Sequence, residues 1–497
     1  MLAVAHSQAL VGLDGVPVEV EAHVARGVPA FTIVGLPDKA VMEARERVRS
    51  GITSAELEFP LRRVTVNLAP GGLRKLGARH DLAIALAILA ATGQVRRDAV
   101  AAVTAIGELA LDGRLRDVPG ALVAAETARA AGSRALLCPA GCAAEAALAG
   151  GLPAHGADHL AQAVAWLRGE LELARAEPRD EPPSGVPPLP DLADVRGQPV
   201  ARRALELAAA GRHNLLMIGP PGTGKTMLAR RLPGILPPLD EADSLAVTRI
   251  HSAAGLLAPG AGRARCAPFR APHHGTSAAA LVGGGASPRM GEVTLAARGV
   301  LFLDELAEFP RNALEALRQP LEDGEVAIAR VGWRACLPAD AQLVAAMNPC
   351  PCGGADGCSC TRERVEAYRA RLSGPLLDRL DLVVRVDRPD ASDLRRDRPE
   401  PSAGVRERVI EARARQTARG QSVSNGRLGL AEIERFGLAT EAGDLVQRAA
   451  EHRRLSARAQ VRLLRLARTA ADLAGAALIG RDHVAEALAL HPAGTPG

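Results

Sequence analysis

The chain has 497 residues, which is too long for one hydrophobic core and suggests about three domains. Hydrophobic residues make up 47% and charged residues 24%, a balance typical of a globular protein rather than a disordered or membrane-embedded one. The net charge of +5 is weak evidence for a polyanionic partner. Aromatic residues are only 2%, too few for a stacking surface for single-stranded bases.

No apolar run reaches membrane-spanning length, so we expect no membrane partner. The N-terminal residues lack a basic stretch followed by an apolar one, the pattern of a secretory signal. We therefore expect a cytoplasmic protein, in which clustered cysteines bind metal or stay reduced more often than they form disulfides.

The sequence predicts an α/β multidomain chain with four parts. A run rich in proline and charge, "EPRDEPPSGVPPLP", cannot form a helix or a central strand and predicts a linker at residues 177–190. It separates an N-terminal domain (1–176), in which strand-like and Ala-rich helical runs alternate, from a nucleotide-binding core (191–390) and a helical C-terminal domain (391–497).

Within the core, three apolar runs predict buried strands, each ending in a polar or glycine residue: "HNLLMIG", "GVLFLDEL" and "AQLVAAMN". Helical patterns alternate with them. Such alternation favours a doubly wound parallel sheet with helices on both faces.

The first of these strands leads into "GPPGTGKT", which opens a helix. Glycines in such a loop let backbone N–H groups surround phosphates, and a lysine reaches the β- and γ-phosphates. The chain has only three lysines (Lys39, Lys75 and Lys225), so Lys225 in this loop is informative. We predict an ATP site formed by Gly219, Pro220, Pro221, Gly222, Thr223, Gly224, Lys225 and Thr226.

The other two strands supply partners for this loop. Asp304, with the Thr226 hydroxyl, is predicted to hold Mg²⁺, and Glu305 to polarise the attacking water. An acidic helix cap after a core strand is the simpler alternative. Asn348 is predicted to orient water against the γ-phosphate, although Asn-Pro also forms ordinary turns.

Four cysteines follow Asn348 within eleven residues: Cys350, Cys352, Cys358 and Cys360. Four thiolates can surround one ion, and tetrahedral Cys₄ sites are a usual structural form of Zn²⁺. The Cys-x-Cys spacing is tighter than the usual Cys-x₂-Cys, so reduced structural thiols or a strained pairing remain alternatives.

With these motifs in this order, and with "FRAPHHGTSAAALVGGG" and "LSGPLLDRLDL", the chain resembles the magnesium-chelatase-like AAA+ ATPases of the YifB/ComM type. The resemblance covers nearly the whole chain. It implies a ring, expected to be a homo-hexamer, with ATP at subunit junctions and a C-terminal helical lid. Arg379 resembles the family's arginine finger, and Arg458 its sensor-2 arginine.

The N-terminal domain resembles the Lon-type protease fold, whose peptidase uses a Ser-Lys dyad. Here Arg79 or a neighbour stands where the serine would be, and "GELALDGRLRDVPGALVAA" has no lysine. We therefore expect no peptidase activity.

ComM-type relatives are DNA helicases that drive branch migration during natural transformation, so the resemblance implies DNA as partner. An insert at about 265–297 and a hairpin at about 324–338 would supply the backbone contacts. The candidates are Arg270, Arg289, Arg330 and Arg334. Each is equally well explained as a solvated loop residue. A magnesium-chelatase motor and a protein-remodelling AAA+ regulator are the alternatives.

Overall fold

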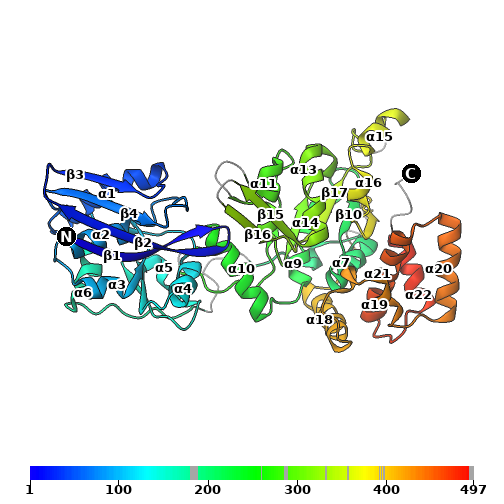
Figure 1. The fold of residues 1–497 in the computed structure, drawn as a ribbon. Helices are drawn as coiled ribbons and strands as arrows, with labels where there is room; N and C mark the ends of the chain where they lie inside the picture. The colour runs from blue at the N-terminus through cyan, green and yellow to red at the C-terminus, as the bar shows by residue number, and fades with distance from the viewer. Residues whose placement is uncertain are drawn as a thin grey trace. The chain divides into compact units, whose positions relative to one another are not determined.

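The computed structural model describes residues 1–179, 188–258, 260–284, 289–330, 333–354, 358–390, 392, 395 and 398–491, with the backbone alone at 329, 330, 333 and 334. Contacts divide the chain into two compact units. The first contains Met1–Val186, Glu241–Arg265 and Ala327–Leu337, and the second contains Pro187–Asp240, Cys266–Val326 and Pro338–Gly497. Figure 1 shows the elements of each. The domain boundaries expected from the sequence remain a prediction.

The first unit is built on a seven-stranded mixed sheet in the order β3-β4-β2-β1-β5-β8-β9. Its strands are β1 (Leu2–Val11), β2 (Asp14–Ala25), β3 (Ala30–Val34), β4 (Arg63–Ala69), β5 (Val103–Ala105), β8 (Ala135–Pro139) and β9 (Ala154–Ala157), with the small pair β6 (Glu108–Leu109) and β7 (Leu115–Arg116). β2 pairs antiparallel with β1 on one side and β4 on the other. β3 pairs in parallel with β4, and β1, β5, β8 and β9 pair in parallel in that order.

The helices of this unit are α1 (Lys39–Ser54), α2 (Asp81–Ala91), α3 (Arg97–Ala101), α4 (Ala121–Ala130), α5 (Ala140–Ala147) and α6 (Leu160–Arg168). Every residue of α2 is buried, because its sequence is apolar on all sides after Asp81. Asp81 itself is paired with Arg47 at 2.6 Å. The expected α+β character of the N-terminal region is confirmed.

Helix α10 (Glu241–Ala253) belongs to this first unit although it follows the nucleotide loop in sequence. Ser252 donates its hydroxyl to Glu145 at 2.6 Å, and its carbonyl accepts the N–H of Gly120. Arg249 pairs with Glu126 at 3.1 Å. These contacts fix α10 to α4 and α5.

The second unit contains a five-stranded, fully parallel sheet in the order β11-β14-β17-β10-β18. Its strands are β11 (Phe269–Arg270), β14 (Val300–Leu303), β17 (Gln342–Met347), β10 (Leu215–Ile218) and β18 (Leu382–Arg385). The parallel sheet is confirmed. Its helices and 3₁₀ turns are η1 (Leu192–Asp194), α7 (Pro199–Gly211), α8 (Lys225–Ala229), α9 (Leu232–Ile235), α11 (Ala278–Val282), α12 (Glu292–Leu295), η2 (Leu306–Glu308), α13 (Arg311–Ala316), α14 (Arg318–Asp323), α15 (Arg362–Arg369) and α16 (Gly374–Leu377).

Two hairpins interrupt the core. β12 (Gly283–Gly284) pairs with β13 (Arg289–Met290) inside the segment where the insert is expected, and β15 (Glu325–Arg330) pairs with β16 (Trp333–Pro338) where the second hairpin is expected. The C-terminal part is helical, as expected: α18 (Ser402–Ala418), η3 (Asn425–Arg427), α19 (Leu430–Glu434), α20 (Thr440–Arg453), α21 (Ala457–Leu473) and α22 (Arg481–Leu490).

A buried charge network joins the C-terminal helices. Asp472 on α21 is fully buried and accepts from Arg419 at 2.5 and 2.7 Å, from Arg468 at 3.1 Å and from Asn425 at 2.7 Å. Arg468 is also fully buried and donates to the carbonyls of Ala476 and Ala477. One fully buried and one partly exposed guanidinium group thus share one buried carboxylate.

We expect Asp472→Ala to lower the free energy of unfolding by about 3–5 kcal/mol, because removing one partner leaves a buried charge uncompensated. Urea denaturation followed by circular dichroism measures it. Glu411→Ala is the control, since Glu411 is exposed and pairs with Arg415 only at 3.4 Å. Equal stability of the two variants would contradict the assignment.

Candidate nucleotide site

The loop between β10 and α8 can be made only with glycine at several positions. Gly222 and Gly224 have φ angles of +78° and +92°, in the left-handed region that side chains avoid. A Cβ on Gly219 would lie 2.0 Å from the carbonyl oxygen of Val386 on the neighbouring chain segment. The backbone is therefore free to approach phosphate oxygens closely, as the motif predicts.

Lys225 opens α8 and is buried. Its ammonium donates to the carbonyls of Gly219 at 2.6 Å and Pro220 at 2.8 Å, and to Oδ1 of Asn348 at 3.2 Å. Burial lowers the pKa of Lys225, and the charges of Asp304 and Glu305 oppose that shift. The loop's own carbonyls thus hold the ammonium where phosphate oxygens are expected to replace them.

Thr226 and Asp304 meet at the carboxyl edge of the sheet. The Thr226 hydroxyl donates to Oδ2 of Asp304 at 2.6 Å, while Oδ1 of Asp304 accepts the N–H of Glu305 at 2.9 Å. One hydroxyl and one carboxylate next to a phosphate loop form the donor set that protein-bound Mg²⁺ prefers. These two side chains fit the predicted magnesium site.

Glu305 is held by a histidine that the sequence did not mark for this role. Its backbone is left-handed (φ +52°), and its carboxylate Oε2 lies 3.0 Å from Nδ1 of His274. His274 follows β11, which is parallel to β14, so both residues leave the sheet at the same edge. The sequence predicted no strand before His274, because β11 has only two residues.

Asn348 lies where the sequence placed it, next to Lys225. It follows β17, which pairs in parallel with β10 on one side and β14 on the other. The Tyr368 hydroxyl on α15 bonds its backbone, and burial raises the pKa of Tyr368 to about 12. The structure therefore brings together Lys225, Thr226, Asp304, Glu305 and Asn348.

Arg379 is held by other partners. Its guanidinium donates to the carbonyl of Pro375 at 2.6 Å and pairs with Glu322 on α14. Its backbone is fixed by Asn214, whose side-chain N–H₂ donates to the Arg379 carbonyl at 2.8 Å. Arg379 thus points to a local acidic partner rather than to Lys225.

Arg458 is exposed in the first turn of α21. One turn later, Arg462 is buried and donates to the carbonyl of Asp378, the residue before Arg379. Sequence reasoning missed Arg462, since nothing distinguishes it from the other arginines of α21. It links the helical lid to the turn that presents Arg379.

The predicted DNA contacts differ in their surroundings. Arg270 on β11 pairs with Glu292 at 2.7 and 2.9 Å, so its charge already has a partner. Arg289 is exposed on β13. The side chains of Arg330 and Arg334 lie outside the described residues.

The four cysteines converge on one point. The sulfur of Cys350 is 3.3 Å from that of Cys352 and 3.5 Å from that of Cys358, and all four Sγ atoms, including that of Cys360, lie within 4.8 Å of one another. A disulfide needs an S–S bond of about 2.05 Å. Ligands about 2.3 Å from a tetrahedral Zn²⁺ are separated by about 3.8 Å, so the cluster fits such an ion.

Several polar side chains of the N-terminal unit, among them Ser7, Arg79 and His80, are buried in its core. Arg79, at the position resembling the peptidase serine, is 5% exposed, and burial lowers its pKa to about 10. Ser7 lies 3.0 Å from His80, whose pKa burial and nearby positive charge lower to about 3. Both of these are buried as well, so they form a core contact.

Three family models match the chain. The magnesium chelatase subunit ChlI model matches residues 191–394, a second model of the ChlI subunit matches 20–141, and the ChlI C-terminal model matches 399–491. Among the described residues, no helix has the length and apolar character needed to cross a membrane.

The chain is similar to proteins of several bacteria. It is 43% identical over 492 residues to "Uncharacterized protein YifB" of Escherichia coli, covering 98% of this chain and 96% of that protein. It is 44% identical over 497 residues to "Competence protein ComM" of Haemophilus influenzae, covering 98% and 97%. An uncharacterized protein of Mycobacterium tuberculosis is 45% identical over 500 residues, covering 99% and 98%.

The parallel sheet and the phosphate loop at its carboxyl edge define a magnesium-chelatase-like AAA+ protein, a class whose members hydrolyse ATP. With near full-length similarity to these relatives, the chain belongs to the YifB/ComM-type family.

We expect His274→Ala to raise basal ATP hydrolysis by up to about fivefold, because it frees the Glu305 carboxylate from a partly exposed contact with His274 worth about 0–1 kcal/mol. Steady-state phosphate release measures the rate. His273→Ala, which removes the ring packed on His274 but keeps both members of the His274–Glu305 pair, is the control. A slower His274→Ala enzyme would mean that the histidine assists Glu305 instead of restraining it.

Proposed function

We propose that this protein is a ring-forming ATPase that couples ATP hydrolysis to the remodelling of branched or single-stranded DNA in the cytoplasm, as a helicase or branch-migration motor. The observation that carries the hydrolytic part is the site at the sheet edge. Lys225, Thr226, Asp304, Glu305 and Asn348 converge there, with one ammonium, one metal-binding pair and one carboxylate for water.

Each side chain has a role in this proposal. Lys225 neutralises the transferred phosphate, Thr226 and Asp304 hold Mg²⁺, and Glu305 accepts a proton from the attacking water. Asn348 orients that water. Mg²⁺ held by Thr226 and Asp304 would neutralise the negative charge of the phosphates.

The ring is supported by the placement of Arg379. In this chain its guanidinium is engaged by Glu322 and the Pro375 carbonyl, next to a turn that Arg462 and Asn214 hold in place. An arginine held away from its own subunit's Lys225 suits a neighbouring subunit's γ-phosphate, where it would exchange Glu322 for that phosphate and stabilise charge in the transition state. We propose that Arg458 of the helical lid also reaches a γ-phosphate and stabilises its charge. A homo-hexamer is the proposed assembly.

We expect Lys225→Ala and Arg379→Ala each to abolish hydrolysis, and a mixture of the two inactive proteins to regain it. Heterologous ring contacts join unlike surfaces, so about a quarter of the junctions in a random equimolar ring pair an intact Lys225 with an intact Arg379. Phosphate release after co-refolding or subunit exchange measures it. No recovery in rings shown to be mixed would place Arg379 in its own subunit's site.

DNA is favoured as the substrate by the relative called a competence protein, since natural competence concerns the uptake of DNA. Arg289 of the insert is exposed and suits a phosphate contact. From the sequence alone, Arg330 and Arg334 of the hairpin are proposed as further phosphate contacts. Arg270 joins them by exchanging Glu292 for a phosphate.

A magnesium-chelatase motor is the second candidate, because all three family models carry the chelatase name. The N-terminal region matches a ChlI model too, so its presence alone does not argue against that activity. A protein-remodelling regulator is the third.

We expect a four-way DNA junction to stimulate ATP hydrolysis several-fold and to be migrated with ATP, whereas Mg²⁺ with porphyrin, or unfolded protein, leaves the rate unchanged. Stimulation should fall steeply between about 50 and 200 mM salt, as phosphate contacts release counterions. Lys225→Ala is the inactive control. Absence of both stimulation and binding at about 50 mM salt rules out DNA as the substrate.

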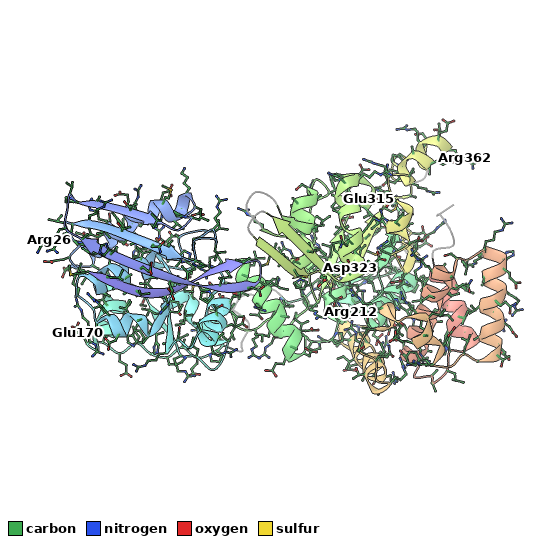
Figure 2. All side chains as sticks on the ribbon, viewed as in Figure 1. Arg26, Glu170, Arg212, Glu315, Asp323 and Arg362 are labelled. Carbon is green, nitrogen blue, oxygen red and sulfur yellow. The ribbon has the colours of Figure 1, made fainter. Side chains whose placement is uncertain are left out.

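Arg289→Ala should weaken this stimulation while basal hydrolysis stays constant. Arg26→Ala is the matched control, because Arg26 is also exposed and lies just after β2 (Figure 2).

A further inference from the structure

We propose that Cys350, Cys352, Cys358 and Cys360 bind one Zn²⁺ and that this metal centre holds the phosphate loop in its nucleotide-binding conformation. The proposal rests on ATP binding at the loop and goes beyond it, since it assigns control of that site to a second, separate metal.

The first argument is the chemistry of the cluster. All four sulfurs lie within 4.8 Å of one another, and among the described residues the group consists of cysteines alone. Soft thiolates select Zn²⁺ over Mg²⁺, so the ion of the nucleotide site would not compete here. Cys350 is 4% exposed, whereas Cys352 and Cys358 are exposed, so an ion can enter from solvent.

The second argument is direct contact with the phosphate loop. A Cβ on Gly353, the residue after Cys352, would lie 2.8 Å from Cδ and 3.0 Å from Cγ of Pro221. Gly353 has φ +96°, and its N–H donates to the carbonyl of Cys350 at 3.0 Å. The cysteine loop is thus folded tightly against a residue of the motif itself.

The third argument is the position of Asn348 at the start of the same loop. Asn348 accepts from Lys225, and Cys350 follows two residues later. On the far side, Thr361 directly after Cys360 caps α15, from which Tyr368 returns to bond the Asn348 backbone. The cysteine segment therefore lies in the chain between Asn348 and Tyr368, two residues that are bonded to each other.

These contacts connect the cysteine cluster to the nucleotide site at two points, Pro221 and Asn348. We call this connection the brace. Pro221 is supported through Gly353, and Asn348 through Cys350. With the ion bound, four sulfur–metal bonds fix the loop between them; without it, only weak thiol contacts remain. Loss of the ion is expected to loosen the phosphate loop and the Lys225–Asn348 contact together.

The test measures two quantities on the full-length protein: zinc content by plasma mass spectrometry, and affinity for a fluorescent ATP analogue with Mg²⁺. We expect one zinc per chain. Removing it with a chelator selective for Zn²⁺ over Mg²⁺ should weaken analogue binding by about tenfold, a change well within the range of coupling free energies between sites. Adding Zn²⁺ back should restore the affinity.

Cys358→Ser should lose both the zinc and the affinity, and added Zn²⁺ should not rescue it. Cys266→Ser, which changes an exposed cysteine outside the cluster, is the matched control and should behave as the unaltered protein. Circular dichroism confirms that each variant is folded. A protein without zinc, or with zinc whose removal leaves the affinity unchanged, overturns the proposal.

Gly353→Ala tests the contact with Pro221 independently of zinc binding. It keeps all four cysteines, but its added Cβ would clash with the Pro221 ring. We expect zinc to stay bound while analogue affinity falls. Gly420→Ala is its control, as Gly420 is also left-handed (φ +76°) but has open space around its Cβ position. Unchanged affinity of a zinc-bound Gly353→Ala protein contradicts the coupling.

The outcomes are distinct from those for the proposed function. If the protein binds zinc and the ATP analogue with the expected coupling but does not respond to DNA, the zinc proposal stands and the proposed DNA substrate is wrong. If the protein holds zinc but does not bind the ATP analogue, both the proposed ATPase function and the coupling between zinc and the phosphate loop are wrong.

Discussion

The parallel register of the core strands is the constraint on which the site depends. β10, β14 and β17 all end at one edge of the sheet, because each pairs with its neighbour in the same direction. Residues that are 79 and 123 positions from Lys225 therefore reach it from adjacent strands: Asp304 through Thr226, and Asn348 directly. Buried apolar strands fix this register, since slippage by one residue would turn their side chains to the opposite face.

The charged groups of the site satisfy one another locally. Lys225 is held by loop carbonyls, Glu305 by His274, and Arg379 by Glu322. Each partner can be exchanged for phosphate, water or a neighbouring subunit without leaving a buried charge unpaired, which would cost several kcal/mol.

Much of the core was predictable, because its strands and the residues at their ends are marked by short, local sequence patterns. The phosphate loop, Asp304, Glu305 and Asn348 each follow a buried apolar run, so sequence alone placed them at strand ends and predicted that they meet. The Ala-rich runs of the N-terminal region likewise predicted helices such as α2. The structure confirms the parallel sheet and the helical C-terminal part.

The rest depends on contacts between distant segments that carry no local pattern. β11 is two residues long, too short to mark His274 as a strand-end residue beside Glu305. The contact of Gly353 with Pro221 joins two glycine-rich loops, and the grouping of α10 with the N-terminal unit depends on single side chains such as Ser252. Charge composition likewise could not tell that Arg270 already has Glu292 as a partner.

The most direct test of the account is the structure of the assembled protein with Mg²⁺ and a non-hydrolysable ATP analogue. The account predicts Lys225 on the β- and γ-phosphates, Thr226 and Asp304 at the Mg²⁺, and Arg379 released from Glu322 to reach the γ-phosphate of the adjacent subunit. A nucleotide-bound ring in which Arg379 stays on Glu322, and no other subunit contributes to the site, would contradict it.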